Sequence, residues 1–71
     1  MEGSIYKIIE VVGTSKNSWE EAAKSAVETA AKSLEDLRVA EIVKLDMAMD
    51  QNQVIAYRAR VNISFKYHGE K

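Results

Sequence analysis

The sequence predicts an α+β domain with the element order β-α-β-β. A β-branched segment at residues 5–12 is followed by a helical pattern that starts at Ser18. Two longer segments, 37–49 and 53–67, then flank the turn-forming triplet Asp50-Gln51-Asn52. Strand, helix and hairpin in this order are typical of an antiparallel sheet with one helix packed on it.

The first expected strand is IYKIIEVV, residues 5–12. Its β-branched side chains suit a pleated, half-buried backbone. The segment runs into Gly13-Thr14-Ser15, a cluster of turn-forming residues. We therefore expect the strand to end before Gly13.

The expected helix begins at Ser18, which stands three residues before Glu21. This is the spacing of a capping box, in which each side chain satisfies a free backbone N–H of the first turn. The apolar residues that follow recur at helical spacing and are mostly alanine: Trp19, Ala22, Ala23, Ala26, Val27, Ala30, Ala31 and Leu34. An alanine stripe lets the helix lie close to a sheet but buries little area, so we expect a thin core.

Residues 37–49 and 53–67 are expected to form a hairpin. In the second segment apolar and polar residues alternate from Ile55 to Tyr67, which gives one apolar face and one polar face. At about 3.3 Å per residue this strand reaches roughly 50 Å, whereas a compact chain of this length is roughly 30 Å across. We expect the strand either to bend around the helix or to meet another subunit, and we favour a closed symmetric oligomer.

The composition narrows the function classes. The 71 residues, which we treat as one domain (residues 1–71), carry 10 Lys and Arg against 11 Asp and Glu, without the basic excess of a nucleic-acid-binding face. No apolar run could span a bilayer, and the N-terminus MEGSIYKIIE is unlike a signal peptide. We expect a cytoplasmic protein with neither nucleic acid nor membrane as a partner. The absence of Cys excludes disulfides, so oligomerisation is the expected source of added stability.

The sequence offers no catalytic constellation. It has no thiol nucleophile, and its single His, His68, lies beside a Gly near the C-terminus and is expected to be solvated. No Ser stands in a G-x-S-x-G elbow. We therefore expect no enzymatic activity.

Charged residues on the polar strand faces leave two interpretations open. The basic residues Lys44, Arg58, Arg60 and Lys66 could cradle an anionic ligand, or form salt bridges with Glu10, Glu41 and Asp46; we favour salt bridges. Asp46 and Asp50 carry the oxygen ligands that calcium takes. They stand about 13 Å apart along a strand, so only a site shared between subunits could use both.

The ordered set of motifs resembles the dodecin family. The resemblance spans about residues 5–67 and is carried by Tyr6-Lys7, Val11 to Ser15, Ser18 to Ala23, Leu34, Leu37, Glu41, Tyr57 and Phe65. It implies a three-stranded antiparallel sheet wrapped around one helix, and assembly of such subunits into a hollow homododecamer. Members of the family typically bind flavins in pairs on twofold axes and store them without catalysis.

Two positions of the flavin site implied by this resemblance differ here. Val39, two residues after Leu37, stands where the family has a Trp on which the flavin ring stacks. Arg58, directly after Tyr57, stands where the family has a Gln. Arg donates hydrogen bonds but cannot accept them. Both differences argue against the usual paired binding of FMN or riboflavin.

The segments Arg38-Val39-Ala40 and Asp46-Met47-Ala48 resemble a branch of the family that lacks this Trp and is associated with calcium. We therefore expect a non-catalytic, homo-oligomeric protein that binds or stores a small ligand, calcium or another. The ligand-binding candidates are Arg38, Val39, Lys44 and Arg58, and the metal candidate is Asp46. Arg38 has two open interpretations, an intersubunit salt bridge or an anion contact. A flavin-storing protein and a structural shell without ligand are the alternatives.

Overall fold

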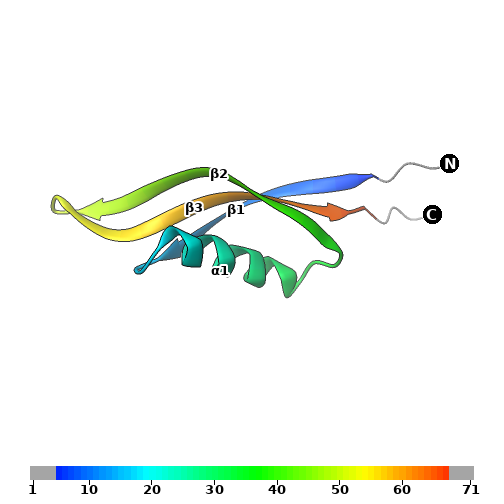
Figure 1. Ribbon diagram of the computed structural model, residues 1–71, viewed down its shortest axis with the longest axis horizontal. Coiled ribbons are helices and arrows are strands. Elements are labelled where there is room, and N and C mark those ends of the chain that lie inside the picture. Colours follow the sequence, from blue (N-terminus) through cyan, green and yellow to red (C-terminus); the bar gives the residue numbers. More distant parts are fainter. Residues whose placement is uncertain (1–4, 68–71) are drawn as a thin grey trace.

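The computed structural model describes residues 5–67 and shows one curved antiparallel sheet with a helix packed against it (Figure 1). Strand β1 (Tyr6–Ser15), helix α1 (Trp19–Ala31), strand β2 (Leu37–Asp50) and strand β3 (Gln53–Lys66) follow in that order. The sheet order is β1-β3-β2, with β3 antiparallel to both neighbours. The predicted α+β architecture is confirmed.

The predicted end of the first strand is wrong. β1 continues through Gly13 to Ser15, which still pairs with Tyr57 of β3. Gly13 is buried, and a Cβ at this position would collide with the carbonyl oxygen of Ala22. Its lack of a side chain therefore serves the close approach of α1 to β1, and the chain turns after Ser15.

The helix begins as predicted and ends earlier. The backbone N–H of Glu21 donates to Ser18 Oγ at 3.0 Å, which is the expected N-cap. The reciprocal half of the capping box is absent from this arrangement, because the Glu21 carboxylate instead accepts from Ser15 Oγ and from Asn17 Nδ2. α1 ends at Ala31, three residues before Leu34. His68 and residues 1–4 lie outside the described residues.

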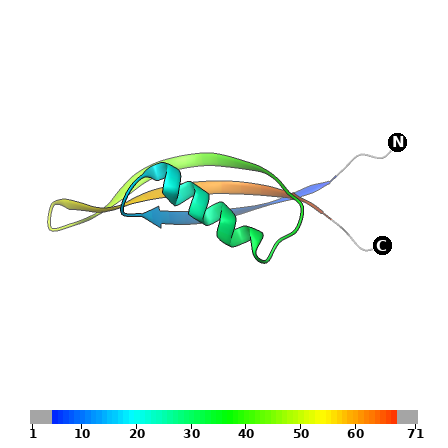
Figure 2. The same cartoon turned by 60° about the horizontal axis from the view of Figure 1, so that its bottom comes forward.

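The core is as thin as the alanine stripe indicates. It consists of Ala22 and Ala26 from α1 and Ala59, Val61 and Ile63 from β3. Figure 2 shows α1 running diagonally across the sheet, so that the helix covers β1 and β3 more than β2. Much of β2 is consequently left without a covering layer in one chain.

The molecule is elongated, with extents of 55 × 20 × 16 Å and a radius of gyration of 14.8 Å. A compact chain of this length has a radius of gyration near 11 Å. The sheet projects beyond α1 at both ends, with the β2–β3 hairpin on the left of Figure 1 and the start of β1 and the end of β3 on the right. The hairpin turn, Gln51-Asn52, has positive φ at both residues, as a two-residue hairpin turn requires. No helix within residues 5–67 is long and apolar enough to cross a membrane.

Candidate functional site

The sequence-predicted site residues gather mainly on the side of the sheet turned away from α1, which we call the helix-distal face. On β3, the buried residues Ala59, Val61 and Ile63 point toward the helix. The residues that alternate with them point away from the helix: Arg58, Arg60, Asn62 and Ser64. Residues paired across neighbouring strands share a face, so each of these β3 residues lies in a row with one β1 and one β2 residue.

Four such rows cross the helix-distal face: Thr14–Arg58–Asp46, Val12–Arg60–Lys44, Glu10–Asn62–Glu41 and Ile8–Ser64–Val39. Adjacent rows are about 6.6 Å apart, because they are separated by two steps along a strand. The chemical character changes from row to row. In the order given, the rows contain an acid with a base, two cations, two carboxylates, and two apolar residues. The face therefore presents separate small sites, with a row of two cations next to a row of two carboxylates.

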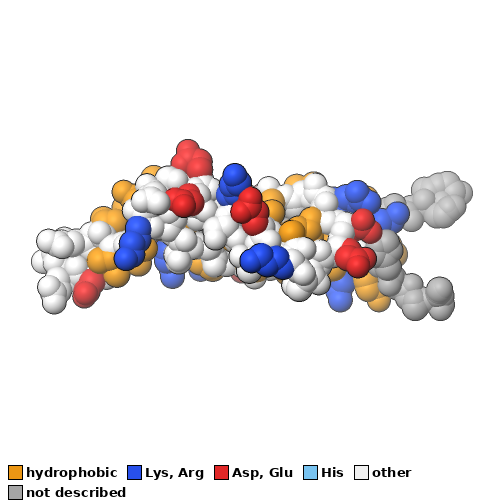
Figure 3. Space-filling view, turned by 90° about the horizontal axis from the view of Figure 1, so that it is seen from below, with side chains coloured by type: hydrophobic (Ala, Val, Ile, Leu, Met, Phe, Trp, Pro, Cys, Tyr) orange, Lys and Arg blue, Asp and Glu red, His pale blue; other side chains and the backbone are white. Residues whose placement is uncertain are grey.

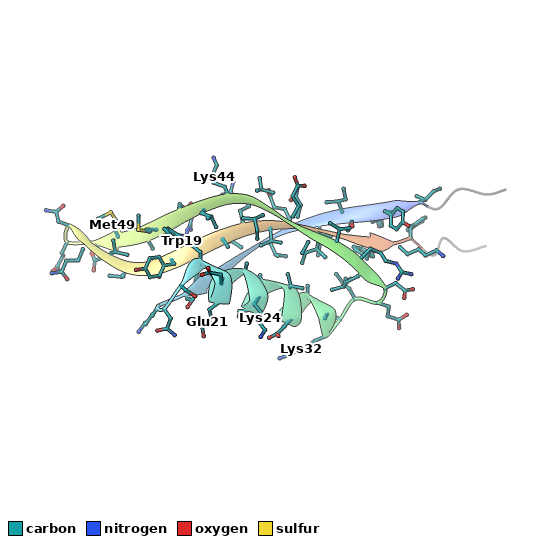
Figure 4. The ribbon with its side chains drawn as sticks, in the orientation of Figure 1. Trp19, Glu21, Lys24, Lys32, Lys44 and Met49 are labelled. Atoms are coloured by element: carbon teal, nitrogen blue, oxygen red, sulfur yellow. The ribbon has the colours of Figure 1, made fainter. Side chains whose placement is uncertain are left out.

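Two β-bulges in β2 decide which of its side chains reach this face. Arg38 is the extra residue of the first bulge and Val43 that of the second. Leu37 packs toward the core, so strict alternation would also turn Val39 toward the helix. The first bulge moves Val39 to the helix-distal face, and the second restores the original phase at Lys44. Figure 4 shows the Lys44 side chain on the side of the sheet opposite α1.

Asp46 and Arg58 form a two-pronged ion pair in the row nearest the hairpin turn. Arg58 Nε donates to Asp46 Oδ1 at 2.7 Å, and Arg58 Nη2 donates to Oδ2 at 3.0 Å. The side chains are 39% and 38% exposed, respectively. Such fork-shaped pairing fixes the orientation of both groups. The salt-bridge interpretation is confirmed for this pair.

The charges around Asp46 are predominantly positive. Hydrogen bonds from Arg58 lower the pKa of the Asp46 carboxyl, partial desolvation opposes this, and the charges of Arg58, Arg60 and Lys44 lower the pKa further. The same hydrogen bonds raise the pKa of Arg58. One carboxylate thus lies among three cations, which makes the local charge positive.

The backbone of Asp46 is held from the opposite side of the sheet by Trp19. The indole Nε1 of Trp19 donates to the carbonyl oxygen of Asp46 at 3.0 Å. The indole ring also meets Tyr57 edge to face, with centroids 5.1 Å apart and an interplanar angle of 71°. Trp19, labelled at the start of α1 in Figure 4, is therefore a structural anchor for β2 and not a ligand platform on the helix-distal face.

The structure brings Lys44, Asp46 and Arg58 together but leaves Val39 apart from them. The rows of Arg58 and Val39 are separated by three intervals of about 6.6 Å, or roughly 20 Å. Val39 is 61% exposed and lies beside an open hollow of about 260 Å³, together with Glu41 and Ser64. Arg38 is exposed at its bulge. Within one chain the ligand-binding candidates thus form two positions, which only a second copy could join into one pocket.

Sequence reasoning missed the row in which Glu10 and Glu41 flank Asn62. We expected these carboxylates opposite basic residues, but Glu10 pairs with Asn62 in the β1–β3 register, and the first bulge of β2 pairs Glu41 with the same residue. A bulge depends on the partner strand, so the sequence of β2 alone carries no signal for it. Within residues 5–67 no three or more acidic or His side chains gather into a metal site.

Comparison with known proteins identifies the fold. A family model described as dodecin matches residues 5–68. The calcium dodecin of Mycobacterium tuberculosis is 48% identical over 63 residues, which cover 89% of each chain. The crystal structure of calcium dodecin from that organism, described as calcium chelating with a calcium-binding site, matches with a TM-score of 0.83 and 44% identity over 96% of this chain and 97% of that chain.

A second solved structure, dodecin from Streptomyces coelicolor, matches with a TM-score of 0.89 and 26% identity over 99% of this chain and 100% of that chain. The element order, the sheet topology and the span of the family match all agree with the resemblance seen in the sequence motifs. The chain belongs to the dodecin family.

Proposed function

We propose that the protein is a non-catalytic, homododecameric protein of the cytoplasm that binds or stores a small ligand, with calcium as the first candidate. The observation that carries this proposal is the 48% identity to a calcium dodecin over nearly the whole chain. Calcium chelation is described for the solved Mycobacterium tuberculosis relative. For this chain calcium binding is a proposal, and substitutions in the charged rows of the helix-distal face can test it.

The exposed apolar surface supports assembly into a larger particle. On the helix side of β2, Ile42, Leu45 and Met47 are 47%, 48% and 45% exposed in one chain. Contiguous apolar patches are uncommon on monomers and typically mark contacts with a partner. A core of five residues is also small for a chain that folds alone. Burial of these side chains between copies would supply the missing apolar contact.

A calcium site would need contributions from more than one copy. Calcium takes six to eight oxygen ligands, and one chain gathers no group of three acidic side chains among its described residues. Asp46 is our candidate ligand, yet both of its oxygens already accept hydrogen bonds from Arg58. We therefore expect calcium to compete with the Arg58 guanidinium for Asp46, and Lys44 and Arg60 to oppose the divalent charge.

The same charges favour a small anion as the second candidate ligand. Lys44, Arg58 and Arg60 share the two rows around the single carboxylate of Asp46. Cations in excess over carboxylates attract phosphate or carboxylate groups. A flavin remains an alternative with weaker support, because Val39 offers no ring for stacking and Arg58 is occupied by Asp46.

Native mass spectrometry of the purified protein tests assembly and ligand together. We expect the mass of twelve chains, whereas a monomeric mass at micromolar concentration would contradict the proposal. Calcium is then tested by thermal unfolding after treatment with chelator. A ligand that binds only the folded state must raise the unfolding temperature, so we expect a rise with calcium and a smaller one with magnesium. An unchanged unfolding temperature at millimolar calcium would exclude calcium, and a yellow protein that releases flavin on denaturation would establish the flavin alternative.

A further inference from the structure

Lys44 of β2 and Arg60 of β3 lie directly opposite each other on the helix-distal face. Side chains paired in this way have Cβ atoms about 5 Å apart, and like charges at this spacing repel each other. The third member of their row, Val12 of β1, carries no charge. Arg60 is half-buried, and neither cation forms a side-chain hydrogen bond or an ion pair with any residue from 5 to 67. The sheet therefore holds two unpaired cations together, which lowers the stability of the chain when no ligand is bound.

The nearest carboxylates do not neutralise these two cations. Asp46, one row nearer the hairpin turn, uses both of its carboxylate oxygens for Arg58. Glu10 and Glu41, one row in the other direction, form no ion pair with either cation within the described part of the chain. On the helix side of the molecule, by contrast, acidic and basic side chains lie interspersed (Figure 3). The row of two cations thus differs from the charged surface around α1.

The charges and donors of these two rows suit a tetrahedral dianion. Three cations and one carboxylate occupy the row of Asp46 and Arg58 and the row of Lys44 and Arg60, so their net charge is two positive. Asp46 occupies only two of the five N–H donors of Arg58, and the Lys44 ammonium adds three more donors. Donors that converge from three side chains match the oxygens of a tetrahedral anion, which point in several directions, better than those of a planar carboxylate.

We propose that Lys44, Arg58 and Arg60 form a site for a tetrahedral dianion of the sulfate or phosphate type, and that this dianion and a divalent cation at Asp46 strengthen each other's binding. The cation half of the inference rests on the calcium binding proposed above and adds its regulation. The Asp46–Arg58 ion pair is the element with two arrangements. Arg58 either holds Asp46, or turns to the dianion and leaves Asp46 to the cation.

The coupling follows from the competition for Asp46. A calcium ion that binds this carboxylate must displace the Arg58 guanidinium, which then lies unpaired beside Lys44 and Arg60. With calcium alone, the four side chains and the ion carry four net positive charges, whose mutual repulsion opposes binding. A dianion in the same two rows halves this charge and gives the released Arg58 a new partner. Each ligand thus makes binding of the other more favourable, and the coupling must be equal in both directions.

Glu10 and Glu41 set the alternative outcome. Their row lies about 6.6 Å from that of Lys44 and Arg60, a distance that long side chains can span. If these carboxylates neutralise the two cations in solution, a dianion finds no free donors. Calcium binding then does not respond to the dianion.

Isothermal titration of calcium in sodium chloride and in sodium sulfate of equal ionic strength tests the coupling. Sulfate is the probe because inorganic phosphate precipitates calcium. We expect calcium to bind at least about fivefold more tightly in sulfate, which is the lower end of the coupling between linked sites. Sulfate also associates weakly with calcium in solution, and this association acts against the expected result.

A third titration, in glycerol 2-phosphate, distinguishes a free inorganic ion from a phosphoryl group carried by an organic molecule. Tighter calcium binding in sulfate alone assigns the site to the free ion. Tighter binding in glycerol 2-phosphate, with or without sulfate, shows that the site accepts a phosphate monoester. Either response supports the site.

Three variants assign the effect to the named residues. In Lys44→Gln/Arg60→Gln the dianion loses most of its donors, and in Arg58→Gln no guanidinium competes for Asp46. In both, the tighter binding of calcium in sulfate should be lost. Lys24→Gln, on the exposed side of α1, removes a Lys charge elsewhere and should keep the full effect.

The outcomes separate the inference from the proposed function. Equal calcium affinity of the parent protein in chloride, sulfate and glycerol 2-phosphate would overturn the inference and leave the calcium proposal intact. No calcium binding in any of the three solutions would overturn both. An effect of sulfate that persists in Lys44→Gln/Arg60→Gln would show that the dianion does not bind at these residues, which also overturns the inference.

Discussion

Trp19 and Asp46 are joined across the sheet by a hydrogen bond of 3.0 Å from the indole Nε1 to the main-chain carbonyl oxygen. On the other face, the side chain of Asp46 is held by Arg58. One residue of β2 is therefore fixed through its backbone by the helix and through its side chain by the central strand. The backbone of Asp46 is thus fixed in place, while a ligand that binds its carboxylate must first displace Arg58.

Replacement of Trp19 tests the backbone half of this arrangement. Trp19→Phe keeps an aromatic ring against Tyr57 but leaves the Asp46 carbonyl without its indole donor. We expect a loss of about 1–2 kcal/mol in the free energy of unfolding, measured by circular dichroism in urea. Lys24→Ala, on the exposed side of α1, is the matched control and should change stability by less than about 0.5 kcal/mol. Equal stability of the two variants would show that the indole hydrogen bond contributes nothing.

The ion pair predicts how stability depends on pH. The pKa of Asp46 is lowered from its ordinary value of 3.8, so the folded state binds the Asp46 proton more weakly than the unfolded state does. The stabilisation is therefore fully present above pH 4 and is lost as the pH falls through the lowered pKa. Arg58, whose pKa is raised, stays charged across this range.

The corresponding measurement compares Asp46→Asn with the parent protein. We expect the parent to unfold at a higher temperature at pH 7, and the difference between the two to shrink as the pH falls below 4. Asp50→Asn, at the end of β2, serves as the control for loss of a carboxylate on the same strand. A difference between parent and Asp46→Asn that stays constant from pH 7 to pH 2 would contradict the role of the pair.

Removal of the Arg58 charge should strengthen calcium binding if Asp46 is a ligand. In Arg58→Gln the carboxylate loses its competing guanidinium, and a dication no longer faces that positive charge. A pair of unit charges at about 4 Å in water contributes roughly 1 kcal/mol, so we expect calcium affinity to rise by at least about fivefold in isothermal titration. The double variant Asp46→Asn/Arg58→Gln should lose this gain. Unchanged affinity in Arg58→Gln would remove Asp46 from the proposed site.

Two substitutions should restore the flavin site that the family resemblance implies. Val39→Trp supplies a stacking ring on the helix-distal face, and Arg58→Gln supplies a group that both donates and accepts. We expect the double variant to quench riboflavin fluorescence at micromolar concentration and the parent protein not to. Because Val39 and Arg58 stand roughly 20 Å apart in one chain, this gain should disappear in any variant that no longer assembles.

Gly13 should not tolerate a side chain. A Cβ there would meet the Ala22 carbonyl oxygen and the Ala26 Cβ, so α1 would have to move away from β1. We expect Gly13→Ala to lower the free energy of unfolding by about 1–3 kcal/mol. Ala30→Gly, a change of the same size in the second half of α1, should cost about 1 kcal/mol through helix propensity alone. Equal losses in the two variants would show that the close helix approach is not needed.

The sequence contains enough information for the element order and little for the site. Ser18 and the alternation in residues 53–67 each depend on local spacing, and both predictions are confirmed. The predicted turn at Gly13 is wrong, because the glycine serves a close approach between helix and strand, which is a tertiary contact. The sequence also does not predict which side chains of β2 face the helix, since the bulges at Arg38 and Val43 exist only in relation to β3. The β2 members of the rows on the helix-distal face depend on this facing of the side chains.

The bulges have one more consequence, which concerns the outer edge of β2. A flat edge of 14 residues would offer an unbroken series of backbone donors and acceptors on which other chains could add without limit. The irregularities at Arg38 and Val43 interrupt this series and increase the local twist. The same two residues that orient the charged rows thus also make this edge less suitable for the addition of further strands.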